Sequence, residues 1–406
     1  MQWLFIHQNS PGQFRGLIPS LLQRGHAVAA IGAHPQLKPT QGLKYFNYRW
    51  SESEPAGRLV DPDLERNLRR AFRVADLARQ LRDEGLQPDA VVFHSGWGEG
   101  LYLRDIWPKA ALIAYPELYG SPQLMGHGFD PDLGLLSEGM QQALRRQNFM
   151  ALAAIADSDA VVVPTLFQRD TFPPHLRGRF HVIHEGVDVE QVRPNPNRHV
   201  QLKPDLMLAK GDPVITYVSR SLEPLRGFRS FMRALPELQA RHSSAQVLIV
   251  GDPAGISYSR PSAHPDGYWG EMVALLGHRL DFSRIHRLGR LPYSELVAIL
   301  QLSAVHVYFS YPYALSWSLL EAMACGAVIV GSANGPVDEV IQHGHNGLLV
   351  PFSAHDQLVN TLLQVLGNID SFASLGIAAR ASVEQRYTLQ ACANGYEQLA
   401  SSLKLI

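Results

Sequence analysis

The two halves of this 406-residue chain open with the same order of elements: a strand, a loop, a helix and a second strand. In the first half the strand is expected at residues 3–7, the loop at 7–12, the helix at 14–23 and the second strand at 27–32. In the second half the strand is expected at residues 215–218 and the loop at 219–226. The helix there begins near residue 227, and the second strand lies at 246–250. Strands that alternate with helices indicate parallel sheets covered on both faces. We therefore expect an α/β fold with two Rossmann-like domains, each with its ligand site beyond the carboxyl ends of its strands.

The length of the chain also favours two domains, because a single hydrophobic core rarely extends so far. A proline-containing linker is expected at residues 188–212. We predict a first domain over residues 1–195 and a second over residues 205–385. Further strands of the first domain are expected at residues 89–93, 111–115 and 159–163.

Composition excludes some classes of protein. A net charge of −1 and a pI near 7.0 give no support to nucleic-acid binding, which needs a basic face. Two distant cysteines, Cys325 and Cys392, exclude a disulfide framework and favour a cytoplasmic location. The first residues lack the basic region and cleavage pattern of a signal peptide. No run reaches the roughly 20 apolar residues of a membrane span, so we expect no transmembrane segment, and peripheral membrane association stays open.

Residues 310–339 carry the clearest functional pattern. A polar, aromatic loop leads into a short helix that contains Glu321 and ends at Gly326. A loop that opens a helix presents free backbone N–H groups, which suit a phosphate. A carboxylate one or two turns later can accept hydrogen bonds from a sugar diol. These residues predict either a sugar-nucleotide site or an ordinary helix–strand unit of an α/β domain.

Two arginines, Arg220 and Arg226, fall in the loop after the first strand of the second half. Arginine offers a permanent charge and a forked set of donors that match phosphate oxygens. Gly227 then allows close backbone approach at the start of the helix. The alternative is a pair of solvated surface arginines near Glu223.

Single residues at strand ends are further candidates. His94 ends a strand and precedes a glycine-rich loop, so it is either a ligand donor or a structural histidine. Gly12 allows backbone approach to a ligand or forms a plain Pro-Gly turn. Arg290 follows Gly289 at the end of another strand, where either a base or a simple turn would fit.

The sequence gives less support to other kinds of site. The carboxylates Glu117 and Glu185 would suggest a glycosidase only at a suitable separation, which the sequence does not fix. The 17 histidines are scattered, so no metal is expected. Residues 64–82 form an arginine-rich helix with Arg66, Arg70 and Arg73 on one face. That face could dock an anionic acceptor or a membrane, but a solvated helix face is favoured.

Four segments together resemble the retaining glycosyltransferases of family 4. The segments are HQNSPGQFRGLIPSLLQRGHAV, HEGVDVEQVRP, SLLEAMACGAVIVGSANGPVDEVI and HNGLLVPFSAHDQL. The likeness covers most of the chain and is strongest from Tyr217 to Phe352. It implies the GT-B fold, in which two Rossmann-like domains have parallel sheets facing across a cleft. It also implies that the last helix, within residues 388–406, crosses back onto the first domain.

The resemblance assigns roles to particular residues. It implies that Arg220 and Arg226 hold the donor diphosphate and that Glu321 binds the nucleotide ribose. His94 would contact the donor sugar. The remaining implied positions are Gly12 near the phosphate and acceptor, the backbone amides of Ala314, Leu315 and Ser316 at the sugar and phosphate, and Gly289, Arg290 and Leu291 around the base.

Three departures from the family pattern bear on the donor site. Tyr313 stands eight residues before Glu321, where the family often has a second glutamate that approaches the sugar. Arg226 replaces a lysine and lies one residue further from Arg220 than usual, so the loop must bulge. Trp317 replaces a small aliphatic residue.

The implied reaction moves a sugar from a nucleoside diphosphate, UDP or GDP, to an acceptor hydroxyl with retention and without a metal or cofactor. The acceptor is a sugar, a lipid-linked group or a protein. Fixed positive groups would stabilise the departing diphosphate, which would itself accept the acceptor's proton. A sugar-nucleotide epimerase and a non-catalytic nucleotide-sugar-binding module remain the alternatives. No G-x-G-x-x-G follows either opening strand, which disfavours a dehydrogenase.

Overall fold

The computed structural model describes residues 1–35, 39–51 and 61–403. The chain divides into two compact units. The first unit contains Met1–Ser121, Leu136–Gly186 and Leu389–Ile406, and the second contains Pro122–Leu135 and Val187–Thr388. The last helix, α13 (Leu389–Leu403), therefore belongs to the first unit.

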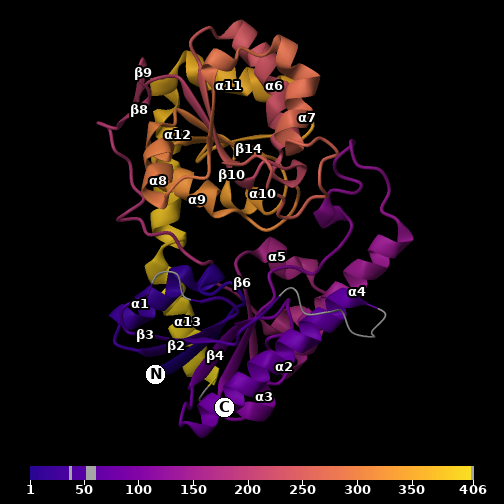
Figure 1. Ribbon diagram of the computed structural model, residues 1–406. Helices are drawn as coiled ribbons and strands as arrows, with labels where there is room; N and C mark the ends of the chain where they lie inside the picture. Colours follow the sequence, from indigo (N-terminus) through magenta and orange to yellow (C-terminus); the bar gives the residue numbers. More distant parts are fainter. Residues whose placement is uncertain (36–38, 52–60, 404–406) are drawn as a thin grey trace. The chain divides into compact units, whose positions relative to one another are not determined.

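The first unit is built on a parallel sheet whose described strands follow the order β3-β2-β1-β4-β5-β6-β7 (Figure 1). These strands are β1 (Gln2–Ile6), β2 (Ala27–Gly32), β3 (Leu43–Asn47), β4 (Ala90–His94), β5 (Ala111–Tyr115), β6 (Ala160–Val163) and β7 (Phe180–Val182). Strands β4, β5 and β6 are buried along their whole length. Continuous apolar runs such as theirs are typical of parallel strands covered on both faces.

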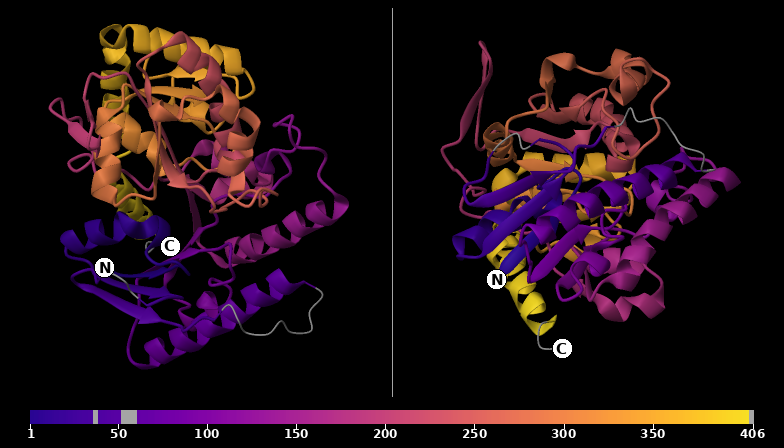
Figure 2. Two further views of the ribbon diagram at one scale, coloured as in Figure 1. Left: turned by 45° about the horizontal axis from the view of Figure 1, so that its top comes forward. Right: turned by 60° about the horizontal axis from the view of Figure 1, so that its bottom comes forward.

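Helices cover both faces of this sheet. They are α1 (Leu17–Gln23), α2 (Pro62–Asp83), α3 (Leu103–Ile106), α4 (Glu138–Asp157), α5 (Leu166–Thr171) and α13, with short 3-10 turns at η1 (Gly12–Arg15) and η3 (Pro174–Arg179). One face packs on α1 and α13, where Trp3, Phe14 and Tyr396 share a core. The other packs on α2 and α3, where Val74 and Leu103 meet the strands. Helices α2 and α4 lie side by side (Figures 1 and 2).

The second unit has a similar parallel sheet, with its described strands in the order β12-β11-β10-β13-β14-β15. These strands are β10 (Val214–Ser221), β11 (Gln246–Asp252), β12 (Ile285–Gly289), β13 (Val305–Tyr308), β14 (Val328–Ser332) and β15 (Leu348–Val350). A separate antiparallel hairpin joins β8 (His199–Lys203) to β9 (Leu206–Ala209). The order reverses between β10 and β13, so ligands are expected beyond the carboxyl ends of these two strands.

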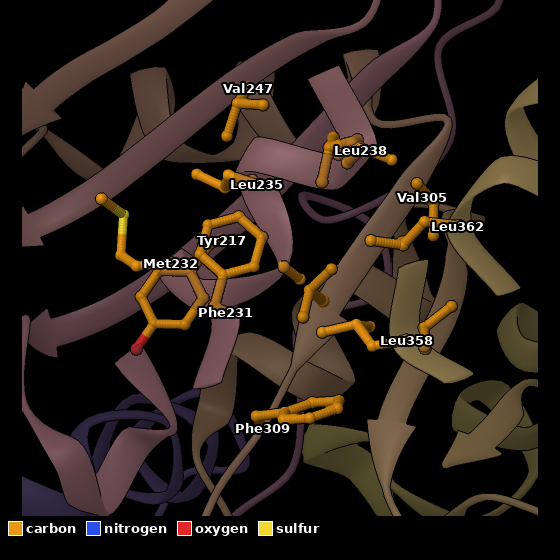
Figure 3. Close-up of a cluster of buried hydrophobic side chains, with 14 of the residues drawn as sticks. Tyr217, Phe231, Met232, Leu235, Leu238, Val247, Val305, Phe309, Leu358 and Leu362 are labelled. Carbon is orange, nitrogen blue, oxygen red and sulfur yellow. The ribbon is translucent and has the colours of Figure 1, made fainter. Parts of the chain in front are cut away.

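The main core of the second unit lies between its sheet and helices α6 and α11 (Figure 3). The helices of this unit are α6 (Phe228–Arg241), α7 (Gly267–Leu276), α8 (Tyr293–Leu302), α9 (Trp317–Ala324), α10 (Val337–Val340), α11 (His355–Gly367) and α12 (Ile369–Arg386). Its 3-10 turns are η2 (Gln123–Met125), η4 (Pro224–Arg226), η5 (Gly277–Arg279) and η6 (Phe282–Arg284). Tyr217 of β10 stacks on Phe231 of α6 with ring centroids 4.9 Å apart. The helical spacing of apolar residues from Phe228 to Leu238 places them in this core, as predicted.

The predicted α/β class with two Rossmann-like units is confirmed. The strands expected at residues 27–32 and 111–115 have the predicted bounds, and the last helix, expected within residues 388–406, is Leu389–Leu403. Three features were missed. Strand β3 is short and half-buried, β7 has only three residues, and the hairpin β8–β9 occupies part of the predicted linker.

Several predicted boundaries differ from the structure, and two of these differences bear on the site. Strand β10 continues to Ser221, so Arg220 lies on the strand and not in the following loop. Its pairing with β11 has an irregular register between Val218 and Ser221. The bulge expected in the loop from Arg220 to Arg226 stays a prediction. The segment Pro122–Leu135, placed in the first domain by the predicted boundary at residue 195, packs within the second unit.

Among the described residues, no single helix has the length and apolar composition needed to cross a membrane. The pair α11 and α12 meets that test only when both helices are counted together, and they are bent by 104°. Leu358 and Leu375 of this pair lie in the core of the second unit.

Candidate functional site

Arg226 is the central charged residue of the second unit. It ends η4, directly before α6. Its Nη1 lies 2.9 Å from the carbonyl oxygen of Ala314 and 3.4 Å from Oγ of Ser310. The guanidinium carbon also lies 5.5 Å from the ring centroid of Tyr258 and 6.0 Å from that of Tyr313. The loop after β13 therefore holds this cation between carbonyl, hydroxyl and aromatic groups.

The same loop leads into α9, and its geometry depends on Tyr308. The Tyr308 hydroxyl accepts a hydrogen bond of 2.8 Å from the backbone N–H of Ser316, the N-cap of α9. It also lies 3.5 Å from Nη1 of Arg226. Burial raises the pKa of Tyr308, so the hydroxyl stays neutral. The amino end of α9 and the Arg226 cation thus meet around one hydroxyl, an arrangement that favours an anion.

Glu321 lies on α9 with 4% of its surface exposed. Its Oε1 accepts a hydrogen bond of 2.9 Å from the hydroxyl of Tyr293, the first residue of α8. Two helices therefore position this carboxylate. An oriented carboxylate close to an anion site is suited to a ribose diol.

Glu223 was noted in the sequence only as a neighbour of the arginines, but it organises the site. It is fully buried, and its Oε2 accepts hydrogen bonds from the backbone N–H groups of Tyr258 at 3.0 Å and Ser259 at 2.8 Å. Glu223 thereby fixes the segment that places Tyr258 beside Arg226. The partners lie more than 30 residues away in the chain, so no local pattern could have predicted this role.

The other predicted residues of the second unit differ in their surroundings. The structure brings Tyr313, Ala314 and Ser316 together with Arg226. Arg220 is exposed, and its side chain has no hydrogen bond or ion pair to any described residue. Leu315 and Leu291 are partly buried in two separate apolar clusters. Arg290 is 69% exposed and pairs with Asp252 at 3.0 Å.

In the first unit, His94 ends β4 and is buried. Its ring stacks on Trp97 with centroids 3.8 Å apart, and its Nδ1 accepts a hydrogen bond of 3.2 Å from the backbone N–H of Gly96. Its Nε2 lies 3.6 Å from Oε2 of Glu117, beyond hydrogen-bonding distance. His94 and Glu117 therefore come together at the carboxyl ends of β4 and β5.

Two more polar residues, His7 and Gln13, and one glycine lie beside this pair. The Nε2 atom of His7 lies 2.5 Å from Oε1 of Gln13, and the side-chain amide of Gln13 donates to Oε1 of Glu117. Burial lowers the pKa of His7 to about 3, so its ring is neutral. Gly12 has a φ of +51°, and a Cβ there would lie 2.3 Å from Nε2 of His7, so only glycine fits.

Burial alone would raise the pKa of Glu117, but His94 and Gln13 outweigh it and lower that pKa. The carboxylate therefore stays ionised. The glycosidase pairing weighed for Glu117 and Glu185 receives no support, because Glu185 instead accepts a hydrogen bond of 2.5 Å from the hydroxyl of Tyr115.

One prediction about the arginine-rich helix is wrong. Arg66 and Arg73 are exposed, but Arg70 is only 3% exposed. Its guanidinium lies over the ring of Trp50 at 4.6 Å and donates to the carbonyl oxygen of Trp97. The helix therefore does not present one continuous arginine face.

Comparisons with known proteins identify the class of molecule that this fold and site define. The family described as "Glycosyl transferase family 4 group" matches residues 24–192, and "Glycosyl transferases group 1" matches residues 212–368. The chain belongs to the glycosyltransferases of the family-4 type, as the sequence resemblance implied.

The individual proteins that match this chain have low sequence identity to it. The chain is 27% identical over 230 residues to the D-inositol 3-phosphate glycosyltransferase of Rhodococcus jostii, covering 55% of this chain and 48% of that protein. It is 25% identical over 282 residues to a GDP-mannose-dependent alpha-(1-6)-phosphatidylinositol monomannoside mannosyltransferase of Mycobacterium tuberculosis, covering 67% and 68%. The chain spans about half the length of the curated relatives it matches first.

Solved structures share the fold. Sucrose-phosphate synthase from Thermosynechococcus elongatus has a TM-score of 0.74 at 17% identity, with 99% of both chains covered. Anabaena HepE in complex with UDP and glucose has a TM-score of 0.70 at 17% identity, with 99% of this chain and 100% of that chain covered. The fold is therefore that of the GT-B glycosyltransferases.

Proposed function

We propose that this protein is a retaining glycosyltransferase that moves a sugar from a nucleoside-diphosphate donor to an acceptor hydroxyl. The observation that carries the proposal is the meeting of the half-buried Arg226 cation with the amino end of α9, one turn before Glu321. Membership of the family and the fold support it.

In the proposed complex the donor diphosphate lies against Arg226 and the first amides of α9, and the exposed Arg220 turns toward it. Glu321 binds the ribose. As the glycosidic bond breaks, negative charge builds on the diphosphate, and prearranged donors lower the barrier because they are already in place. The diphosphate then accepts the proton of the acceptor hydroxyl. We propose that these protein charges replace a metal ion.

The donor is proposed to be a UDP- or GDP-sugar. Support comes from the names of similar proteins, since one structure contains UDP-glucose and one relative is GDP-mannose-dependent. Relatives named for inositol phosphate and phosphatidylinositol mannoside support a sugar or lipid-linked acceptor over a protein. We also propose a cytoplasmic location, consistent with two unpaired, buried cysteines. A lipid-linked acceptor such as the one in a relative's name would call for peripheral membrane association.

A non-catalytic sugar-nucleotide-binding role is the second candidate. It is favoured by Tyr313, which places an aromatic ring beside Arg226 where the family often has a carboxylate. A sugar-nucleotide epimerase would bind the same donor but need no acceptor. Product analysis with and without acceptor separates these candidates from transfer.

Binding is tested first, by calorimetry with UDP, GDP, ADP and CDP. We expect one of these to bind tightly and Arg226→Lys to weaken that binding. The matching nucleotide sugar is then followed for turnover and for the anomeric configuration of the product. No binding by any of the four nucleotides would overturn the proposal, and binding without turnover would favour the non-catalytic candidate.

A further inference from the structure

A second polar site lies in the first unit, at the carboxyl ends of β1, β4 and β5. We propose that Glu117, together with His94, binds one hydroxyl group of a carbohydrate substrate, and that Gln13 and His7 hold Glu117 in place. This inference rests on the proposed function, but it concerns residues of the first unit.

The hydrogen-bond pattern determines which ring nitrogens carry protons. The backbone N–H of Asn9 donates to Nδ1 of His7 at 2.9 Å, so the proton of that neutral ring is on Nε2 and points to Oε1 of Gln13. Gln13 then has its amide N–H groups free to donate to Glu117. The backbone N–H of Gly96 donates to Nδ1 of His94 in the same way, so Nε2 of His94 carries a proton.

With the protons placed in this way, one hydrogen-bond donor and one acceptor of the site lie near each other but form no hydrogen bond between them. Nε2 of His94 is buried and has no hydrogen-bond partner among the described residues. It lies 3.6 Å from Oε2 of Glu117. An oxygen atom placed beside both could lie at about 2.8 Å from each, the usual hydrogen-bond length. A hydroxyl group is the ligand that accepts from the histidine and donates to the carboxylate at the same time.

Glu117 is both accessible and held rigidly. Its side chain is 30% exposed, whereas that of His94 is 3% exposed. Its φ of +61° is uncommon for a residue other than glycine, and such backbone strain concentrates at functional sites. The side-chain amide of Gln168 donates to its backbone carbonyl at 3.1 Å, which secures this conformation.

The charge of the site selects the kind of ligand. An ionised carboxylate repels a phosphate but strengthens a hydrogen bond from a neutral hydroxyl. Among the described residues, no group of three or more histidine, cysteine, aspartate or glutamate side chains could hold a metal ion. A sugar hydroxyl is therefore the ligand that fits, and it can come from the donor sugar or from the acceptor.

The test compares wild type with Glu117→Gln, which keeps the shape of the side chain but removes its charge. Glu84→Gln, on an exposed carboxylate of the same unit, is the matched control. The affinities for UDP and UDP-glucose, and for GDP and GDP-mannose, are measured by calorimetry. Hydrolysis of the preferred donor is then measured as kcat and KM, with water in place of the acceptor hydroxyl.

If the hydroxyl belongs to the donor sugar, Glu117→Gln weakens binding of the nucleotide sugar by roughly tenfold or more and leaves the free diphosphate unaffected, because a hydrogen bond to a charged group is lost. If it belongs to the acceptor, KM is unchanged and kcat falls by a similar factor. Gln13→Leu, which removes only the positioning contact, should give a smaller effect of the same kind.

Wild-type values in all of these measurements for Glu117→Gln would overturn the inference while leaving the proposed function intact. If Glu117→Gln does not fold, Gln13→Leu decides by the same readouts, and unchanged values for it overturn the inference. Failure of the wild-type protein to bind UDP, GDP, ADP and CDP would instead overturn the proposed function, and this inference with it.

Discussion

Arg226 shows how one residue can be both structural and functional. Its guanidinium is tied to the loop after β13 through Ala314 and lies near the neighbouring rings of Tyr258 and Tyr313. A lysine there keeps the charge but cannot make these planar, forked contacts. We expect Arg226→Lys to lower turnover of the nucleotide sugar by roughly a hundredfold. Arg241→Lys, at an exposed ion pair, is the control, and equal rates for both variants would contradict the assignment.

Glu321 is predicted to act on nucleotide affinity. Its carboxylate is oriented by the hydroxyl of Tyr293. Glu321→Ala should weaken binding of the free nucleoside diphosphate by about tenfold or more, because hydrogen bonds to a charged group are lost. Tyr293→Phe should produce a smaller loss. Calorimetry measures both, and an unchanged affinity for Glu321→Ala would rule out the ribose role.

Glu99 gives a pH-dependent prediction. Burial raises the pKa of this carboxyl to about 7, and the hydroxyl of Tyr48 donates to it at 2.9 Å. Between its ordinary pKa near 4.5 and pH 7 the folded state holds the proton and the unfolded state does not. The free energy of unfolding therefore falls as pH rises through this window, by up to about 1.4 kcal/mol per pH unit.

Glu99→Gln removes this titration. Urea unfolding of wild type and Glu99→Gln from pH 5 to pH 8 should show the wild type losing stability relative to the variant up to about pH 7 and no further above it. Other titrating groups, such as His7, are common to both proteins and cancel in the difference. Parallel curves across the range would show that Glu99 has an ordinary pKa.

At the scale of elements, the segment Pro122–Leu135 joins the core of the second unit although its neighbours in sequence belong to the first. The hydroxyl of Tyr311 donates to Asp130, both groups being buried, and Phe129 packs against Phe352 at 5.0 Å. Tyr311 also donates its backbone N–H to Leu225, next to Arg226. The segment thus supports the loop that holds the Arg226 cation.

Asp130→Ala should lower the free energy of unfolding by about 1–3 kcal/mol, because the buried hydroxyl of Tyr311 loses its acceptor. Asp132→Ala is the matched control. Its ion pair with Arg233 is about 30% exposed on both sides, so its loss should cost less than about 1 kcal/mol. Urea denaturation gives both values, and equal losses would show that the Tyr311 contact contributes no more than a surface pair.

The elements also show what sequence can predict. Strands such as β4 and β5 were identified because a buried parallel strand is a continuous apolar run. Arg226 and Glu321 were singled out by position, in the loop after a first strand and on a helix that follows a loop, and the family resemblance then assigned their roles. Gln13 and Glu223 were missed because their partners lie far away in sequence, at Glu117 and around Tyr258. The roles that the family resemblance assigns to the site residues, including Arg220 and Arg290, stay predictions.

At the scale of the whole molecule, a ligand that binds only the folded protein raises its stability. A thermal-shift panel of UDP, GDP, ADP and CDP should therefore raise the melting temperature for the base that the site accepts, and the shift should grow with ligand concentration. Arg226→Lys should show a smaller shift at the same concentration. A flat response for all four nucleotides would agree with the calorimetric outcome that overturns the proposed function.

Helix α13 belongs to the first unit, where Cys392 and Tyr396 pack with Trp3 and Phe14. During translation these side chains leave the ribosome only after all of the second unit has emerged. The half of the protein that is made first must therefore wait, with part of its hydrophobic surface uncovered, while the half that is made later can already fold. A nascent chain halted before Leu389 should bind a chaperone through its earlier portion.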